Sequence, residues 1–120
     1  MINRVILTGN LSRDPELRTT ATGASILQYG IAVNEKVKEG NEWVDRASFF
    51  DVKMFGKRAE ALESILTKGM KVTIEGRLRQ DRWQDNEGRN KSKVVINADE
   101  IEFNQKRNEQ PAQPSEDIPF

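Results

Sequence analysis

The sequence predicts an all-β fold: a five-stranded Greek-key barrel with one short helix between its third and fourth strands, followed by a disordered C-terminal tail. Two observations support this fold class. Apolar and polar residues alternate with a period of two in several segments, which is typical of half-buried strands. One segment between them has helical spacing instead. The 120 residues are enough for one compact domain of this kind.

The first two strands are separated by a turn-rich stretch. Residues 3–9 are predicted to form a short strand, and residues 10–23 hold the turn. Residues 25–35 alternate apolar with small or polar side chains, so they are predicted to form the second strand, with a bulge or bend at Gly30. The charged segment 36–43 is interpreted as a hairpin loop.

The third strand, residues 48–55 ("SFFDVKMF"), has one apolar face and one mixed face. Because side chains alternate along a strand, Phe50, Val52 and Met54 are predicted to point into the core. The outward face then holds an acid, a lysine and two aromatic rings: Phe49, Asp51, Lys53 and Phe55. Two aromatic rings on a face that should be exposed to solvent need a functional or a packing explanation.

The segment 57–69 changes to helical spacing, with one apolar stripe made by Ala59, Leu62, Ile65 and Leu66. Lys68 is interpreted as a cation near the C-terminal end of this helix, and Gly69 as the residue that ends it. The helix is therefore predicted to lie between the third and fourth strands.

Two more strands complete the barrel. Residues 70–78 alternate strictly, and Leu78 is predicted to point inward. Residues 94–103 alternate from Val94 onward, but the phase changes near Asp99, which predicts a bulge there. Five strands in this order, with one helix after the third, are typical of the OB-fold.

The chain is divided into an OB-fold domain, residues 1–103, and a tail, residues 104–120. The tail is polar, contains prolines and lacks periodicity, so it is predicted to be disordered. It ends in "EDIPF", which places two acids before an apolar tip.

The composition excludes several kinds of chemistry. Histidine and cysteine are absent, which removes zinc sites and the usual activated nucleophiles, so we expect no enzyme activity, no metal and no cofactor. No apolar stretch is long enough to span a membrane, and the N-terminus lacks a signal-peptide layout, so we expect a cytoplasmic protein without a membrane partner. Nineteen basic and nineteen acidic residues balance, although residues 77–93 hold six basic and three acidic ones.

Aromatic rings beside cations indicate a surface for unpaired nucleic acid, because single strands are bound by base stacking and phosphate neutralisation. Phe49 and Phe55 flank Lys53 on the outward face of their strand, about 20 Å apart at roughly 3.4 Å per residue. Trp83 lies in a basic segment that reads as an extended hairpin, and Trp43 lies next to the charged loop. The alternative is that a helix, a loop or a partner subunit covers these rings.

Four motifs resemble those of the bacterial single-stranded DNA-binding protein family. They are "NRVILTGNLSRDPELR" (3–18), "FGK" (55–57), "KGMKVTIEGRLR" (68–79) and "RWQDNEG" (82–88), in the family's order. The resemblance covers about residues 1–103, and the terminal "EDIPF" is similar to the family's acidic tip. It implies an OB-fold that binds and protects single-stranded DNA, whatever its sequence, in replication, recombination and repair, in association with the nucleoid.

The resemblance also implies roles for individual residues. The stacking positions are Phe49, Phe55 and Trp83, with Trp43 as a further candidate. The phosphate-binding positions are Arg4, Arg18, Lys57, Lys68, Arg79 and Arg82, to which the strand pattern adds Lys53. The tip that would dock replication and repair proteins comprises Glu116, Asp117, Ile118, Pro119 and Phe120. Members of the family usually assemble as homotetramers, which we expect here too.

The chain departs from the family pattern at two places in the site. Val37 stands where many members have an aromatic residue, and Asp81 stands where a basic residue is frequent. The alternative function is an OB-fold protein-interaction subunit, similar to primosomal adaptor proteins, whose outward rings would serve a protein interface. RNA binding is a third alternative, because no residue is seen to read the sugar 2′-hydroxyl.

Overall fold

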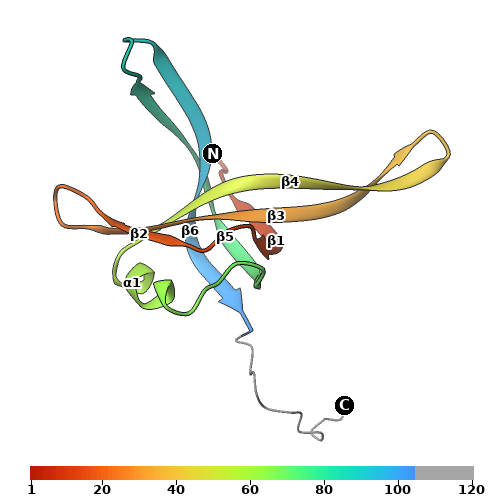
Figure 1. Cartoon of the computed structure of the whole chain (residues 1–120), viewed down its shortest axis with the longest axis horizontal. Helices are drawn as coiled ribbons and strands as arrows, with labels where there is room; N and C mark the ends of the chain where they lie inside the picture. Colours follow the sequence, from red (N-terminus) through yellow and green to blue (C-terminus); the bar gives the residue numbers. More distant parts are fainter. Residues whose placement is uncertain (105–120) are drawn as a thin grey trace, which may run out of the picture.

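Six strands and one helix are present in residues 1–104, the part of the chain that the computed structural model describes (Figure 1). In chain order they are β1 (Val5–Leu11), β2 (Glu16–Thr19), β3 (Ser25–Glu39), β4 (Glu42–Phe55), α1 (Lys57–Glu63), β5 (Lys71–Gln84) and β6 (Asn90–Phe103).

Five of these strands close into a barrel. The sheet runs in the order β1-β5-β6-β4-β3, and β3 pairs with β1 to complete the circle. Neighbouring strands are antiparallel except β4 and β6, which are parallel. The helix lies between the third and fourth strands of the barrel in sequence. The predicted barrel with one short helix is therefore confirmed, and residues 105–120 of the predicted disordered tail lie outside the described residues.

The short strand β2 lies in the stretch that the sequence analysis assigns to a turn, and that assignment is wrong. Its four residues are all exposed and pair with β3 at the edge of the sheet. An edge strand with no buried face needs no apolar alternation, so the period-two pattern does not mark it.

The core fills the barrel and extends under α1. Leu27, Tyr29 and Ile31 of β3 and Val52 and Met54 of β4 are at most 2% exposed, as their alternation predicts. Ala59 and Leu62, the first two residues of the apolar helical stripe, belong to the same buried cluster.

The helix is shorter than predicted. It ends at Glu63 rather than near Gly69, although Leu66 beyond it is still buried. The apolar stripe therefore continues into the turn that follows the helix. The interpretation of Lys68 as a helix-terminal cation is wrong, because the helix has already ended and the backbone N–H of Lys68 donates to the Asp14 carboxylate at 2.8 Å.

A bulge in β6 is confirmed at Asp99. Two successive residues of β5, Glu75 and Gly76, pair with residues of β6 that are two apart, which leaves Asp99 between them. The strands approach closely here, since a Cβ on Gly76 would lie 2.0 Å from the carbonyl oxygen of Asn97. Gly30, in contrast, pairs in continuous register with β4, so of the two features expected there, a bulge or a bend, the bulge is absent.

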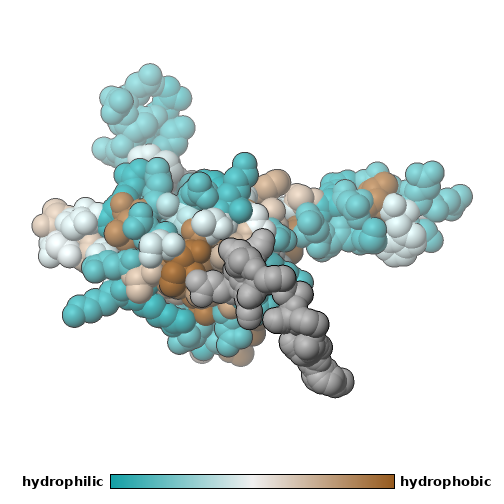
Figure 2. Space-filling model, turned by 60° about the horizontal axis from the view of Figure 1, so that its bottom comes forward, coloured by the Kyte–Doolittle hydropathy of each residue, from teal (hydrophilic) through white to brown (hydrophobic). Residues whose placement is uncertain are grey.

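The β3–β4 and β5–β6 hairpins extend beyond the barrel as long arms (Figure 1). The β3–β4 arm turns at Gly40 and Asn41, so most of the predicted loop 36–43 is strand. In the β5–β6 arm, Leu78 and Val94 are exposed, contrary to expectation, because β5 continues beyond its last pair with β1, Val5 with Gly76. Hydrophilic residues dominate the surface of both arms, whereas apolar residues gather on the barrel (Figure 2).

Candidate nucleic-acid interface

The outward face of β3 and β4 carries two exposed rings. The strands pair in one continuous register, which sets Phe49 opposite Ala32 and Phe55 opposite Ile26. Residues directly opposite each other in an antiparallel pair lie on the same face of the sheet. Phe49 is 68% exposed and Phe55 is 48% exposed. Both rings therefore lie open to solvent, on the side of β4 that the alternation predicts.

The sheet extends this face to β2. Arg18 pairs with Ile26, which pairs with Phe55, so the three residues form one row across β2, β3 and β4. Two strand spacings place the backbones of Arg18 and Phe55 roughly 10 Å apart. The Arg18 guanidinium is 3.4 Å from the Glu16 carboxylate but is still 64% exposed. Exposed Lys57 follows Phe55 at the start of α1, so two cations lie near this ring.

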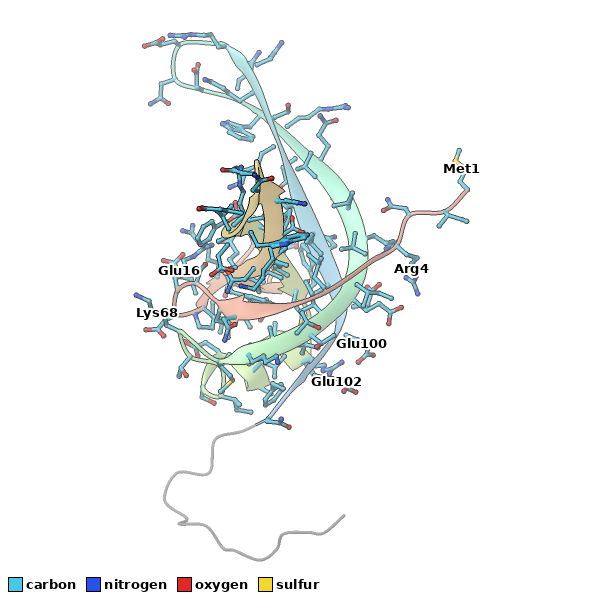
Figure 3. The ribbon with its side chains drawn as sticks, turned by 90° about the vertical axis from the view of Figure 1, so that its right-hand side faces the viewer. Met1, Arg4, Glu16, Lys68, Glu100 and Glu102 are labelled. Carbon is cyan, nitrogen blue, oxygen red and sulfur yellow. The ribbon has the colours of Figure 1, made fainter. Side chains whose placement is uncertain are left out.

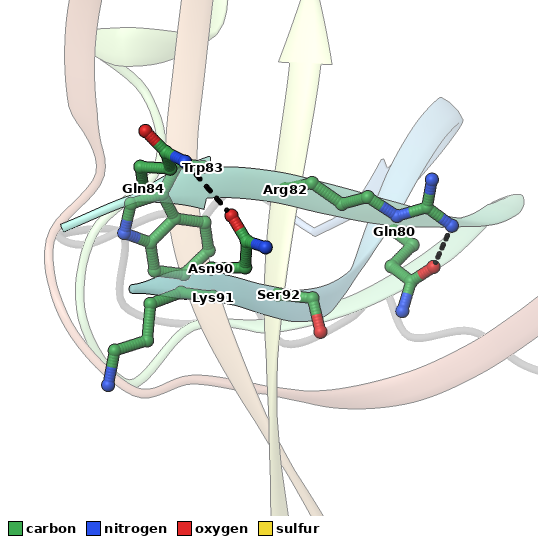
Figure 4. Close-up of a pocket in the computed structure, with 7 residues that line it drawn as sticks. All are labelled: Gln80, Arg82, Trp83, Gln84, Asn90, Lys91 and Ser92. Atoms are coloured by element: carbon green, nitrogen blue, oxygen red, sulfur yellow. Dashed lines mark hydrogen bonds between the residues drawn. The ribbon is translucent and has the colours of Figure 1, made fainter. Parts of the chain in front are cut away.

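The β5–β6 arm presents a third ring. Trp83 is 47% exposed and lies opposite Lys91 in the antiparallel register. Alternation along β5 places Arg79 on the same face as Trp83. A cavity of about 460 Å³ lies along this part of the arm, lined in part by Trp83 and Lys91 (Figure 4).

Arg82 is not on the face of Trp83, although the two are neighbours in sequence. Consecutive residues of a strand point to opposite faces. The Arg82 guanidinium donates instead to the side-chain carbonyl of Gln80 at 2.7 Å (Figure 4). The positive charge beside Trp83 therefore comes from Arg79 and Lys91 rather than from Arg82.

A groove joins Trp83 to the outward face of β4. It has a volume of about 260 Å³, and its lining includes Asp51 and Lys53 of β4, Asp81 and Trp83 of β5, and Lys93 of β6. Arg13, from the loop after β1, also lines it. The barrel thus brings together residues that no local sequence pattern links.

The charges in this groove are paired with one another. The Lys53 ammonium lies 2.7 Å from the Asp81 carboxylate. Asp51 accepts from Lys93 at 2.6 Å and from Arg13 at 3.4 Å. The hydrogen bond from Lys93 lowers the pKa of Asp51 below its ordinary value of 3.8, against the desolvation that raises it. Asp51 therefore stays ionised at neutral pH.

Gly30 explains how Arg13 reaches Asp51. It lies on the outward face of β3, directly opposite Asp51. A Cβ at this position would lie 2.7 Å from Nη1 of Arg13 and 2.5 Å from Oγ of Ser12. The absence of a side chain at Gly30 leaves room for the Arg13 guanidinium to lie across the sheet.

Of the predicted stacking and phosphate-binding residues, only Lys53 and Trp83 line the groove, so Phe49 and Phe55 lie outside its lining. Arg4, Lys68 and Trp43 also lie outside it. Arg4 pairs with Glu75 of β5 at 3.2 Å, and Figure 3 shows Arg4 and Lys68 on opposite sides of the barrel. Trp43 is 64% exposed on the β3–β4 arm, opposite Lys38. The predicted docking tip, residues 116–120, lies outside the described residues.

Three cations near the rings are missing from the sequence-based assignment: Arg13, Lys91 and Lys93. Lys91 and Lys93 have a signal in the sequence, because a hairpin closed at Asp85–Arg89 sets them opposite Trp83 and Asp81. Arg13 has no such signal, since its position depends on how the loop after β1 crosses β3.

An OB-fold barrel whose outward face carries exposed rings and cations is the architecture of proteins that bind single-stranded nucleic acids. Comparison with known proteins assigns the chain more narrowly. The model of the single-strand binding protein family matches residues 2–104, and the chain belongs to this family.

Several relatives illustrate the similarity. The chain is 40% identical to the single-stranded DNA-binding protein of Treponema pallidum (strain Nichols), over 85% of this chain and 57% of that protein. It is 42% identical to the protein of that name from Borreliella burgdorferi, over 85% of this chain and 69% of the relative. The chain thus spans little more than half the length of the first of these relatives.

A solved structure agrees with the barrel. The crystal structure of a deletion mutant of the single-stranded DNA binding protein from Thermus aquaticus superimposes with a TM-score of 0.77 at 29% identity. The match covers 88% of this chain and 52% of that one. Within residues 1–104, no helix is both long enough and apolar enough to cross a membrane.

Proposed function

We propose that this chain binds single-stranded DNA without reading its sequence, and that Phe49, Phe55 and Trp83 are its stacking platforms. The supporting observation is that three rings, each at least 47% exposed, lie on the strands that line one groove. Stacking accepts any base, because every base has a flat face. A duplex hides those faces, so unpaired strands are preferred. The proposed function is binding alone, with no catalytic step.

The rings supply enough free energy for useful affinity. Each stacked base contributes about 1–3 kcal/mol, so three platforms supply roughly 3–9 kcal/mol before entropic costs. Micromolar binding corresponds to about 8 kcal/mol. Trp43 extends this path along the β3–β4 arm, because it lies on the same side of β4 as Phe49 by alternation.

Phosphate contacts are proposed at the two ends of the stacking path. Lys57 and Arg18 flank Phe55, and Arg79 and Lys91 flank Trp83. Within residues 1–104, Lys57, Arg79 and Lys91 take part in no ion pair, so their charges are available. Among the other predicted cations, Lys53 lies in the groove and is paired with Asp81. Arg4, Lys68 and Arg82 would contact only a DNA strand that continues around the barrel or over the far face of the arm.

The test is a titration of intrinsic tryptophan fluorescence with oligo(dT) in the full chain. We expect strong quenching, most of which Trp83→Ala removes. Raising the salt concentration weakens the affinity, because phosphate contacts release counterions. No quenching at low salt would contradict the proposal and favour the protein-interaction adaptor, whose rings would contact a protein.

We also propose that this binding protects unwound DNA in replication, recombination and repair in the bacterial cytoplasm, and that the chain forms homotetramers. Residues 116–120 would dock partner proteins. Light scattering with and without oligo(dT) measures assembly and stoichiometry together, and a monomer in both conditions would contradict the tetramer. Deleting residues 116–120 should abolish partner docking and leave oligo(dT) affinity intact.

A further inference from the structure

The groove between β4 and the β5–β6 arm is close to neutral, although it lies where a polyanion is proposed to bind. Its lining holds three cations, Arg13, Lys53 and Lys93, and two carboxylates, Asp51 and Asp81. Each of the three cations is bonded to one of the two carboxylates. Both carboxylates therefore occupy positions that phosphate oxygens would otherwise take.

The pair between Lys53 and Asp81 is more buried than ordinary surface pairs. Lys53 is 25% exposed and Asp81 is 35% exposed, with 2.7 Å between their charged atoms. In every other ion pair among residues 1–104, including the two that Asp51 makes with Arg13 and Lys93, at least one side chain is half exposed or more. Exchanging Asp81 for a phosphate would leave a partly desolvated carboxylate without a partner and close to the phosphate's negative charge. The exchange is therefore unfavourable.

We propose that Asp51 and Asp81 are internal counterions, which hold Arg13, Lys53 and Lys93 in ion pairs and keep them from binding phosphate. The proposal rests on the proposed binding of single-stranded DNA. The bound DNA strand is then held across the groove by base stacking alone. The salt dependence of binding comes from cations outside the groove, such as Lys57 and Arg79. Asp51 and Asp81 thus determine how much the phosphate charges of the DNA, as opposed to its bases, contribute to the affinity.

The size of the effect follows from counterion release. Each phosphate that a cation neutralises on a single strand changes the slope of log affinity against log salt by about −0.7. Asp81→Asn frees Lys53, so it should tighten oligo(dT) binding about fivefold at roughly 0.1 M salt and steepen the slope by about 0.7. Asp51→Asn frees Arg13 and Lys93, so it should tighten binding about 25-fold and steepen the slope by about 1.4.

The experiment measures oligo(dT) affinity of the full chain by tryptophan quenching between about 0.05 and about 0.4 M salt. The matched control is Glu100→Gln, which also removes one negative charge. Glu100 pairs with Arg58 of α1 and lies outside the groove lining. It should leave affinity and slope unchanged. A thermal melt of each variant shows that it is folded.

A second variant tests the paired state directly. Lys53→Gln together with Asp81→Asn replaces the ion pair with two amides and keeps the groove charge constant. We expect this double variant to bind oligo(dT) with the affinity and slope of the unchanged chain. If Lys53 contacts a phosphate despite Asp81, the double variant will instead bind about fivefold more weakly at roughly 0.1 M salt, with a slope shallower by about 0.7. That result would overturn the proposal.

The outcomes separate this proposal from the proposed function. If the unchanged chain binds oligo(dT), but Asp51→Asn and Asp81→Asn behave like Glu100→Gln, then the counterion role is wrong and DNA binding stands. If the unchanged chain does not bind oligo(dT), both are wrong. Tighter binding with a steeper slope in the two groove variants alone supports both.

Discussion

Truncating Phe49 to alanine separates binding from folding in this chain. The ring is 68% exposed and faces Ala32 across the strand pair. Fully burying a phenylalanine contributes about 1.5–3 kcal/mol, so the buried third of this ring contributes roughly 0.5–1 kcal/mol to the free energy of unfolding. Loss of one stacked base costs about 1–3 kcal/mol of binding, which weakens the affinity about 5- to 150-fold. Phe49→Ala should therefore remain folded and bind much less tightly.

The assay is the oligo(dT) titration at fixed salt, since both tryptophans remain as reporters in Phe49→Ala. The matched control is Val94→Ala, which truncates another exposed apolar residue, on the face of the β5–β6 arm away from Trp83. The control should bind within about twofold of the unchanged chain. Equal affinity of Phe49→Ala and Val94→Ala would refute the assignment of this ring to base stacking.

Three further predictions test the site and the fold. Gly76→Ala should lower the free energy of unfolding, measured by urea titration, by about 1–3 kcal/mol, because the new Cβ would meet the Asn97 carbonyl. An unchanged urea midpoint would show that β5 and β6 separate freely at this position. Asp51→Asn should lower the Tm at neutral pH. The Tm difference should disappear as the pH falls below 3.8, the ordinary pKa of the carboxyl group. A group whose pKa is lowered by folding stabilises the fold above its ordinary pKa, and this stabilisation is lost as the pH falls through the folded-state pKa. A Tm difference that persists in acid would contradict this linkage. Arg79→Gln should make the salt slope of oligo(dT) binding shallower by about 0.7, and Arg82→Gln, on the opposite face, should change it less; equal effects would contradict the facial assignment.

Much of the barrel could be predicted from periodicity because its strands have one buried face and one solvent-exposed face. The alternation of Leu27, Tyr29 and Ile31 reports a buried face directly, and the change of phase near Asp99 reports the bulge. The same rule fails at Phe50, which is predicted to point into the core but is 37% exposed, and at Leu78 and Val94. Alternation indicates which residues share a face of a strand. It does not indicate whether that face is covered by the barrel core at every position along the strand.

The site was predictable in part for the same reason. The outward positions of Phe49 and Phe55 follow from the period of two, and so does the separation of Arg82 from Trp83, which the basic appearance of the segment conceals. The pairing of Lys53 with Asp81 could not be predicted. It depends on how the β5–β6 arm crosses β4, and no local pattern encodes a contact between distant strands.

The central claim is that unpaired bases lie on the exposed rings of this barrel. Ultraviolet cross-linking of oligo(dT) to the full chain, followed by mass spectrometry of the peptides, tests it most directly. We expect cross-links at Phe49, Phe55 and Trp83. Cross-links confined to the face of the β5–β6 arm that carries Val94, with none at the three rings, would contradict the claim.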